Sequence, residues 1–114
     1  MRDVADVRSL ALALPEAVEL DHFGNPSFRV RGKIFATWSP CENRMTCKFA
    51  LPDQMALLTT DPETFSAEKH WGRFGWTRVQ LAGMPAALVA DLLRQSWCTA
   101  APKSLQKTLA AIKG

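Results

Sequence analysis

Basic side chains recur at alternate positions in stretches of the chain that have the composition of β-strands. Alternate residues of a strand point to the same face of a sheet, so each stretch places its cations on one surface. Phosphate groups bind such cations, and a neighbouring indole ring can stack on a nucleic-acid base. The pattern therefore indicates an anion- or nucleic-acid-binding sheet face. Its members are Arg29, Arg31, Arg44, Lys48 and Arg78, with Lys33 at a hairpin tip and Trp76 as the indole.

The same pattern is also typical of a solvated sheet face, where Lys, Arg and Thr keep a protein soluble. The net charge of +3 comes from 14 basic and 11 acidic side chains, and this excess alone does not identify a nucleic-acid-binding protein. Lys103 and Lys107 lie one turn apart on a basic C-terminal helix. They fit either a phosphate contact beside the sheet or a solvated helix face.

The stretch Trp71-Gly72-Arg73-Phe74-Gly75-Trp76 offers a different kind of site. Its glycines permit a tight, irregular backbone, and its indoles could frame a pocket for a small flat ligand. The alternative is a loop packed against the core by its own aromatic side chains. The candidate pocket residues are His70, Trp71, Arg73 and Trp76.

Metal-binding spacing is weak. The possible soft ligands are scattered, and Cys41 and Cys47 are too far apart for a Cys-x-x-Cys knuckle. Acidic residues gather near the N-terminus, but acids near a helix start also complement the helix dipole. We therefore expect no metal site and three reduced thiols. The residues considered are His22, Cys41, Cys47, His70, Cys98, Asp3, Asp6, Glu16, Glu19 and Asp21.

Catalytic patterns are weaker still. Asp21 and His22 are adjacent in the chain, so on a strand they would point to opposite faces. The serines lie in no Gly-x-Ser-x-Gly motif, and the sequence has no phosphate-binding glycine loop or dinucleotide fingerprint. We expect a protein that is not an enzyme and has no cofactor.

The elements that must position these residues follow from periodicity and from Pro and Gly. Helical spacing with Asp3 as a cap and Pro15 as a stop gives the first helix. Three alternating segments, a short helix and a fourth strand follow, and two helices close the chain. The fold class is α+β, in the order α-β-β-β-α-β-α-α. The expected elements are 3–14, 28–30, 33–38, 44–49, 52–60, 76–81 and helices opened by Pro85 and Pro102.

Two turns fit the first hairpin. A two-residue turn at Gly32-Lys33 would pair Arg31 with Ile34, whereas a longer turn would pair Val30 with Ile34 and separate the faces more cleanly. Expected buried positions follow from alternation in the third strand and from helical spacing in the helices. They are Met45, Cys47, Phe49, Met55, Leu57, Leu58, Val89, Leu92, Leu93, Ser96, Trp97, Leu105, Leu109 and Ile112.

The length of 114 residues fits one domain spanning 1–114. No apolar run approaches the roughly 20 residues that span a bilayer, and the N-terminus does not resemble a signal peptide. We therefore expect a cytoplasmic protein, and a monomer.

Six short segments in this order resemble the MmcQ/YjbR family of small bacterial proteins. Together they run from about residue 10 to residue 105. They are Ala13-Leu14-Pro15-Glu16, His22-Phe23-Gly24, Pro26-Ser27-Phe28-Arg29-Val30, Gly32-Lys33-Ile34-Phe35-Ala36, Trp71-Gly72 with Gly75-Trp76, and Ala101-Pro102-Lys103.

The resemblance implies a frataxin-like (CyaY-like) arrangement, with helices on one face of an antiparallel sheet. Members of this family are commonly labelled DNA-binding, through a proposed pair of hairpin wings. With the charge distribution, this implies weak, non-specific binding of double-stranded DNA. One wing would hold Arg29, Arg31 and Lys33, with Arg44, Lys48, Arg78 and Lys103 around it. The alternative is a protein- or small-ligand-binding module that uses the loop from Trp71 to Trp76. The chain also lacks tyrosine, and Trp97 stands where a tyrosine is expected.

Overall fold

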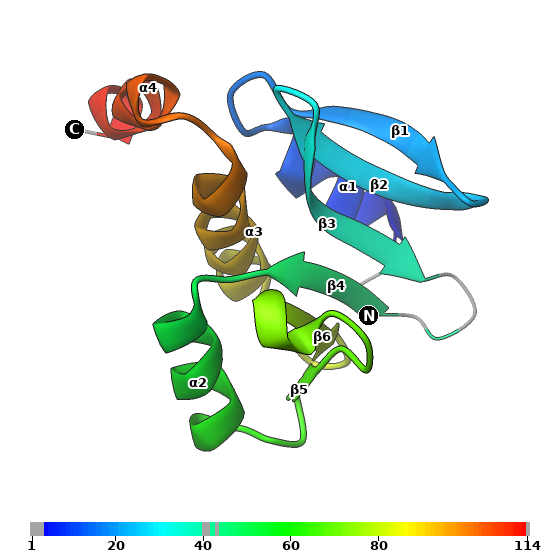
Figure 1. Ribbon diagram of the computed structural model, residues 1–114. Coiled ribbons are helices and arrows are strands. Elements are labelled where there is room, and N and C mark those ends of the chain that lie inside the picture. The colour runs from blue at the N-terminus through cyan, green and yellow to red at the C-terminus, as the bar shows by residue number, and fades with distance from the viewer. Residues whose placement is uncertain (1–3, 40–41, 43, 114) are drawn as a thin grey trace.

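The computed structural model of the protein describes residues 4–39, 42 and 44–113. Four strands follow the first helix, and two more follow the second (Figure 1). The expected cap Asp3 lies outside the described residues. The elements are α1 (Val4–Leu12), β1 (Val18–His22), β2 (Asn25–Val30), β3 (Lys33–Ser39), β4 (Arg44–Lys48), α2 (Leu51–Thr60), β5 (Phe65–Ala67), the 3-10 helix η1 (Gly72–Phe74), β6 (Trp76–Gln80), α3 (Ala86–Ala100) and α4 (Lys103–Lys113).

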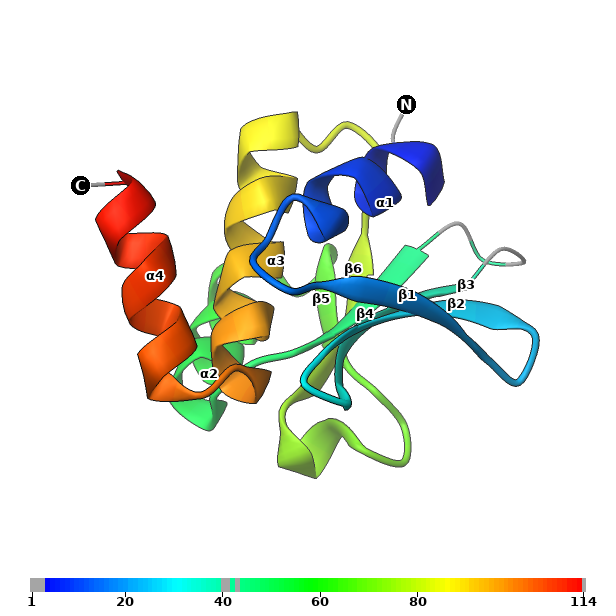
Figure 2. The same cartoon turned by 90° about the horizontal axis from the view of Figure 1, so that it is seen from above.

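The strands form one antiparallel sheet in the order β1-β2-β3-β4-β6-β5. Helices α1 and α3 cover one face, while the segment containing η1 lies on the other side (Figure 2). We call this second side the open face. No helix in the described part of the chain is long and apolar enough to cross a membrane. The α+β class and the antiparallel sheet agree with the expectation from the sequence.

The core lies between the sheet and the helices. Met45, Cys47 and Phe49 are buried, as strand alternation predicts. The stripe predicted on α3 is also buried, and it includes Trp97. The Trp97 indole Nε1 donates a hydrogen bond to the Pro15 carbonyl at 3.0 Å, which ties the end of α3 to the connection after α1. The indole that replaces the expected tyrosine thus has a polar partner.

The first hairpin uses neither expected turn. Val30 pairs with Lys33, so the turn consists of Arg31 and Gly32, with φ angles of +51° and +81°. Positive φ at both central residues matches the twist of the flanking strands. The register then shifts, which lets consecutive Phe35 and Ala36 both reach the core. Arg31 therefore lies in a turn and does not share a strand face with Arg29.

Two strands are missing from the expected order, β1 and β5. Strand β1 lies at an edge, and its Val18 and Leu20 are about half exposed, so it lacks a buried alternating row. Strand β5 has only three residues. In α2 the expected burial of Met55 is wrong, since this side chain is 70% exposed, and Gln54 is buried in its place. On α4, Leu105 is buried as expected, whereas the side chains of Leu109 and Ile112 lie outside the description.

Candidate anion-binding pocket

A pocket of about 510 Å³ lies on the open face of the sheet. Its floor comes from the central strands β3, β4 and β6. One wall is residues 68–76, which include η1, and the other is the turn between β1 and β2. These two walls stand on opposite sides of the floor, because β6 and β2 flank β3 and β4 in the sheet. The lining residues are His22, Phe23, Ile34, Thr37, Ser39, Arg44, Thr46, Glu68, Trp71, Trp76 and Arg78.

Strand register places the polar floor residues side by side. Thr37 pairs with Thr46 across β3 and β4, and Thr46 pairs with Arg78 across β4 and β6. Arg44 pairs with Gln80, so it is the diagonal neighbour of Arg78 on the same face. The expected shared face of β4 and β6 is therefore confirmed. It places Arg44 and Arg78 next to each other, with Thr37 and Thr46 beside them in the pocket lining.

The charged form of Arg44 is disfavoured in this position. Burial lowers the pKa of Arg44, and the like charge of Arg78 lowers it further, while Glu68 acts in the opposite direction. Only 16% of the Arg44 side chain is exposed, and its Nη2 forms an ion pair with Glu42. An opposite charge within reach of both guanidinium groups would therefore be stabilising.

Both arginines also carry an unused donor. The Nε atoms of Arg44 and Arg78 are buried and have no hydrogen-bond partner in the described part of the chain. Buried polar groups nearly always have a partner, so each unpaired donor needs an explanation such as a water or an ion. Two such donors lie in the lining of one pocket, which makes this arginine pair the candidate binding feature of the open face.

Glu68 is the acidic member of the pocket. Its Oε2 accepts hydrogen bonds from the backbone N–H groups of His70 and Trp71, each at 2.8 Å. Burial alone would raise the pKa of Glu68, but these hydrogen bonds and the charges of His70 and Arg78 together lower it. Glu68 is therefore ionised at neutral pH, and it fixes the turn that carries Trp71.

The wall that includes η1 is anchored by a buried polar side chain. Gln54 Nε2 donates to the Gly72 carbonyl at 2.9 Å, the Trp76 carbonyl at 3.3 Å and Thr77 Oγ1 at 3.1 Å. Gly75 adopts φ of +100°, and a Cβ there would lie 2.0 Å from the Phe49 carbonyl oxygen. Only glycine fits this close approach.

Two aromatic rings of this wall do not anchor it. Trp71 is 58% exposed and Phe74 is 49% exposed, so the expectation of a loop packed by its own aromatics is wrong for these two rings. The Arg73 guanidinium lies over the Phe74 ring, 4.9 Å from its centroid. Trp71 and Trp76 line the pocket, whereas Arg73 and His70 do not.

The opposite wall ends in an unusual turn. Phe23 and Gly24 form its centre with φ of +54° and +87°, and the Phe23 side chain is 92% exposed. A bulky residue rarely adopts left-handed backbone. The His22 ring packs edge-on against Phe23 with centroids 4.7 Å apart, and both rings line the pocket.

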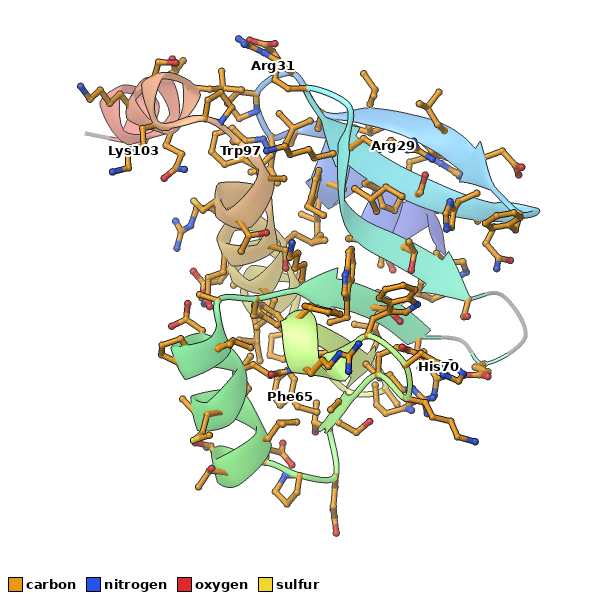
Figure 3. All side chains as sticks on the ribbon, viewed as in Figure 1. Arg29, Arg31, Phe65, His70, Trp97 and Lys103 are labelled. Atoms are coloured by element: carbon orange, nitrogen blue, oxygen red, sulfur yellow. The ribbon has the colours of Figure 1, made fainter. Side chains whose placement is uncertain are left out.

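The remaining predicted DNA-binding residues are spread over the molecule (Figure 3). Arg29 and Lys48 lie on the open face but outside the pocket, and Arg29 Nε donates to Ser27 Oγ at 3.1 Å. Lys33 is exposed beside the hairpin turn. Lys103 begins α4, which is tied to α3 by a hydrogen bond from Gln106 to the Cys98 carbonyl, on the helix side (Figure 2).

Arg31 is held by an ion pair away from the pocket. Its Nε and Nη2 contact the two Glu16 carboxylate oxygens at 2.6 Å and 2.9 Å. The hydrogen bond from Arg31 lowers the pKa of Glu16 and more than offsets the small effect of burial. Arg31, one of the cations expected to bind phosphate, is therefore paired with a carboxylate of the same chain.

Metal-ligating side chains do not converge in the described structure. No group of three or more His, Cys, Asp or Glu residues there is placed to hold an ion. Cys47 is a core residue, and its burial raises the pKa of the thiol to about 12. Cys41 and Asp3 lie outside the described residues. Asp21 caps the Gly24 backbone N–H, and its neighbour His22 lines the pocket.

Several pocket residues were missed by the sequence reasoning. Thr37 follows the same alternation that placed Thr46 outward, so its position was predictable in principle. Phe23 and Glu68 carry no periodic signal, because they lie outside regular helices and strands. Gln54, which anchors the wall from α2, was missed because it is a polar residue on a helix.

Comparison with known proteins identifies the class. The YjbR family model matches residues 12–99, and the chain belongs to this family. The crystal structure of Deinococcus radiodurans protein DR2400, which carries a DUF419 domain, is similar with a TM-score of 0.80 and 25% sequence identity. The similarity covers 96% of this chain and 89% of that one. No curated protein matches the chain.

Proposed function

We propose that this protein is a binding module, not an enzyme, and that it holds a small anionic ligand in the open-face pocket. The observation that carries the proposal is the pair of neighbouring guanidinium groups of Arg44 and Arg78 in one pocket, each with an Nε–H that has no partner among the described residues. Hydrogen bonds to charged groups are the stronger kind, contributing about 1.5–3 kcal/mol each. An anion beside the two guanidinium groups would offset the repulsion that the charge of Arg78 exerts on Arg44.

The pocket has the size and composition of a small-molecule site. Its volume of about 510 Å³ lies in the range of about 300–1,000 Å³ that is typical for such ligands. Trp71, Trp76 and Ile34 supply apolar surface, and the arginines with Thr37 and Thr46 supply polar groups. This combination unites the two sequence hypotheses, since the basic sheet face and the tryptophan loop form one site.

Isothermal titration calorimetry with inorganic phosphate and with benzoate tests the proposal. The variant Arg78→Gln should weaken anion binding by about 10-fold or more, because a charge-assisted hydrogen bond is lost. Arg29→Gln is the matched control on the same face outside the pocket, and it should bind as the parent does. Equal affinity in Arg78→Gln and Arg29→Gln, or no binding of any anion, contradicts the proposal.

Binding of double-stranded DNA is the second candidate. Arg29 and Lys48 lie on the same open face as the arginine pair, which supports a weak, non-specific phosphate contact there. Fluorescence anisotropy of a labelled duplex at about 50 and about 200 mM salt tests it. Arg29→Ala with Lys48→Ala should then weaken binding more than Arg31→Ala with Lys33→Ala.

The affinity of a small ligand bound in the pocket should depend much less on salt, because buried ion pairs are weakly screened.

A cytoplasmic location, a monomeric state and the lack of a cofactor belong to this proposal as expectations from the sequence. The frataxin-like arrangement also stays a prediction from the resemblance.

A further inference from the structure

Resting on the proposed function, we infer that the ligand is a nucleotide, with a phosphate monoester at the arginine pair and its base stacked on an exposed aromatic ring at the mouth of the pocket, where Phe23 and Trp71 lie. A base that carries a phosphate monoester can come from two sources. One is a free mononucleotide, and the other is the 5′-phosphorylated end of a single strand.

The donor set favours phosphate over carboxylate. A carboxylate has two oxygens, which one guanidinium fork satisfies. The pocket instead presents donors from two guanidinium groups and, beside them, the hydroxyls of Thr37 and Thr46. A phosphate monoester has three strong acceptor oxygens and a charge of about −1.5 to −2. It is therefore the anion that uses donors arriving from several directions.

The surrounding acids limit how much negative charge the pocket accepts. Glu42 forms an ion pair with Arg44, and Glu68 lies close enough to both arginines to affect the Arg44 pKa and to be affected by Arg78. Two carboxylates thus already oppose two guanidinium charges. A monophosphate fits this balance better than a diphosphate or triphosphate would.

The rings at the mouth indicate a flat partner. Phe23 and Trp71 come from opposite walls of the same pocket, and they are 92% and 58% exposed. Exposed aromatic rings on facing walls provide stacking surfaces, and stacking on aromatic side chains is the usual way to hold a base. The left-handed backbone at Phe23 is unfavourable for a bulky residue, and such strain concentrates at ligand clamps.

Calorimetry with AMP, adenosine, inorganic phosphate and benzoate tests the inference. AMP should bind at least about 10-fold more tightly than adenosine or phosphate alone, because only AMP fills both parts of the pocket. Phe23→Ala should weaken AMP by about 10-fold and leave phosphate unchanged. Leu20→Ala is the matched control, an exposed apolar side chain of the same hairpin that does not line the pocket. Phe23→Leu, checked by thermal unfolding, keeps the test valid should the alanine variant fold poorly.

A 5′-phosphorylated oligonucleotide and its 5′-hydroxyl form separate the two sources. Tighter binding of the phosphorylated strand than of AMP assigns the strand end, and the reverse order assigns the free nucleotide. Equal binding of the two strands, with no binding of AMP, overturns the inference. Benzoate binding as tightly as AMP, or AMP binding no better than phosphate, overturns it while leaving the proposed function intact. Failure of every anion to bind removes both.

Discussion

Phe23 illustrates at the residue scale how a ligand site can cost stability. Its φ of +54° places a bulky side chain in left-handed backbone, and its ring remains 92% exposed. Left-handed backbone costs an ordinary residue about 1–2 kcal/mol, and asparagine tolerates it far better. We therefore predict that Phe23→Asn raises the free energy of unfolding by about 1 kcal/mol, measured by urea denaturation. A decrease in stability would show that the Phe23 ring contributes contacts to the fold.

The cysteines give a second prediction at the residue scale. Burial raises the pKa of the Cys47 thiol to about 12, so near pH 8 it holds almost no thiolate in the folded state. Cys98 is exposed, although partial burial also raises its pKa. A maleimide should label Cys98 in the native protein and Cys47 only after unfolding, as peptide mass mapping would show. Cys98→Ser supplies the control, and native labelling of Cys47 would contradict the prediction.

Predictability at this scale depended on which residues carry a periodic signal. Arg44, Arg78 and Trp76 were placed on one face by strand alternation, and the structure confirms that face. Phe23 and Glu68 were not predicted, because turn residues have no period and their partners are backbone groups or distant walls. Arg31 was misplaced since the turn formed one residue earlier than expected.

At the scale of elements, α2 positions the tryptophan wall through Gln54. This side chain donates to two backbone carbonyls of that wall and to Thr77 Oγ1, and each such hydrogen bond contributes about 0.5–1.5 kcal/mol. Gln54→Leu should therefore lower the free energy of unfolding by about 2 kcal/mol and weaken anion binding. Met55→Leu is the control on the same helix, since Met55 is largely exposed. Chemical denaturation and calorimetry measure the two effects, and unchanged anion affinity would separate Gln54 from the pocket.

Elements with a buried alternating or helical stripe were predicted well, as β4 and α3 show. Those that lack such a stripe were missed or misjudged. Strand β1 is held at the sheet edge by backbone pairing to β2, not by buried side chains of its own. In α2 the buried residue is Gln54, whose side chain is held by hydrogen bonds. A prediction based on hydrophobic spacing therefore placed Met55 in the core instead.

At the scale of the whole molecule, helices close one face of the sheet and leave the other free for a site (Figure 2). The open face then holds two adjacent guanidinium groups, and burial and the charge of Arg78 lower the pKa of Arg44 in spite of Glu68, so the charged pair carries an electrostatic cost. Stability and binding should consequently move in opposite directions when one arginine is removed. This opposition distinguishes a ligand site from a merely solvated basic face.

We predict that Arg78→Gln unfolds at a higher urea concentration than the parent when no anion is present, because the repulsion on Arg44 is relieved. Adding phosphate at about 100-fold above its Kd should stabilise the parent by about 2.7 kcal/mol and the variant far less. Arg94→Gln, which removes a cation on α3 away from the pocket, should retain the full phosphate effect. Equal stabilisation of all three proteins by phosphate would place the bound anion elsewhere on the molecule. A crossing of the parent and Arg78→Gln stabilities as phosphate is added would show that the anion offsets the cost of the arginine pair.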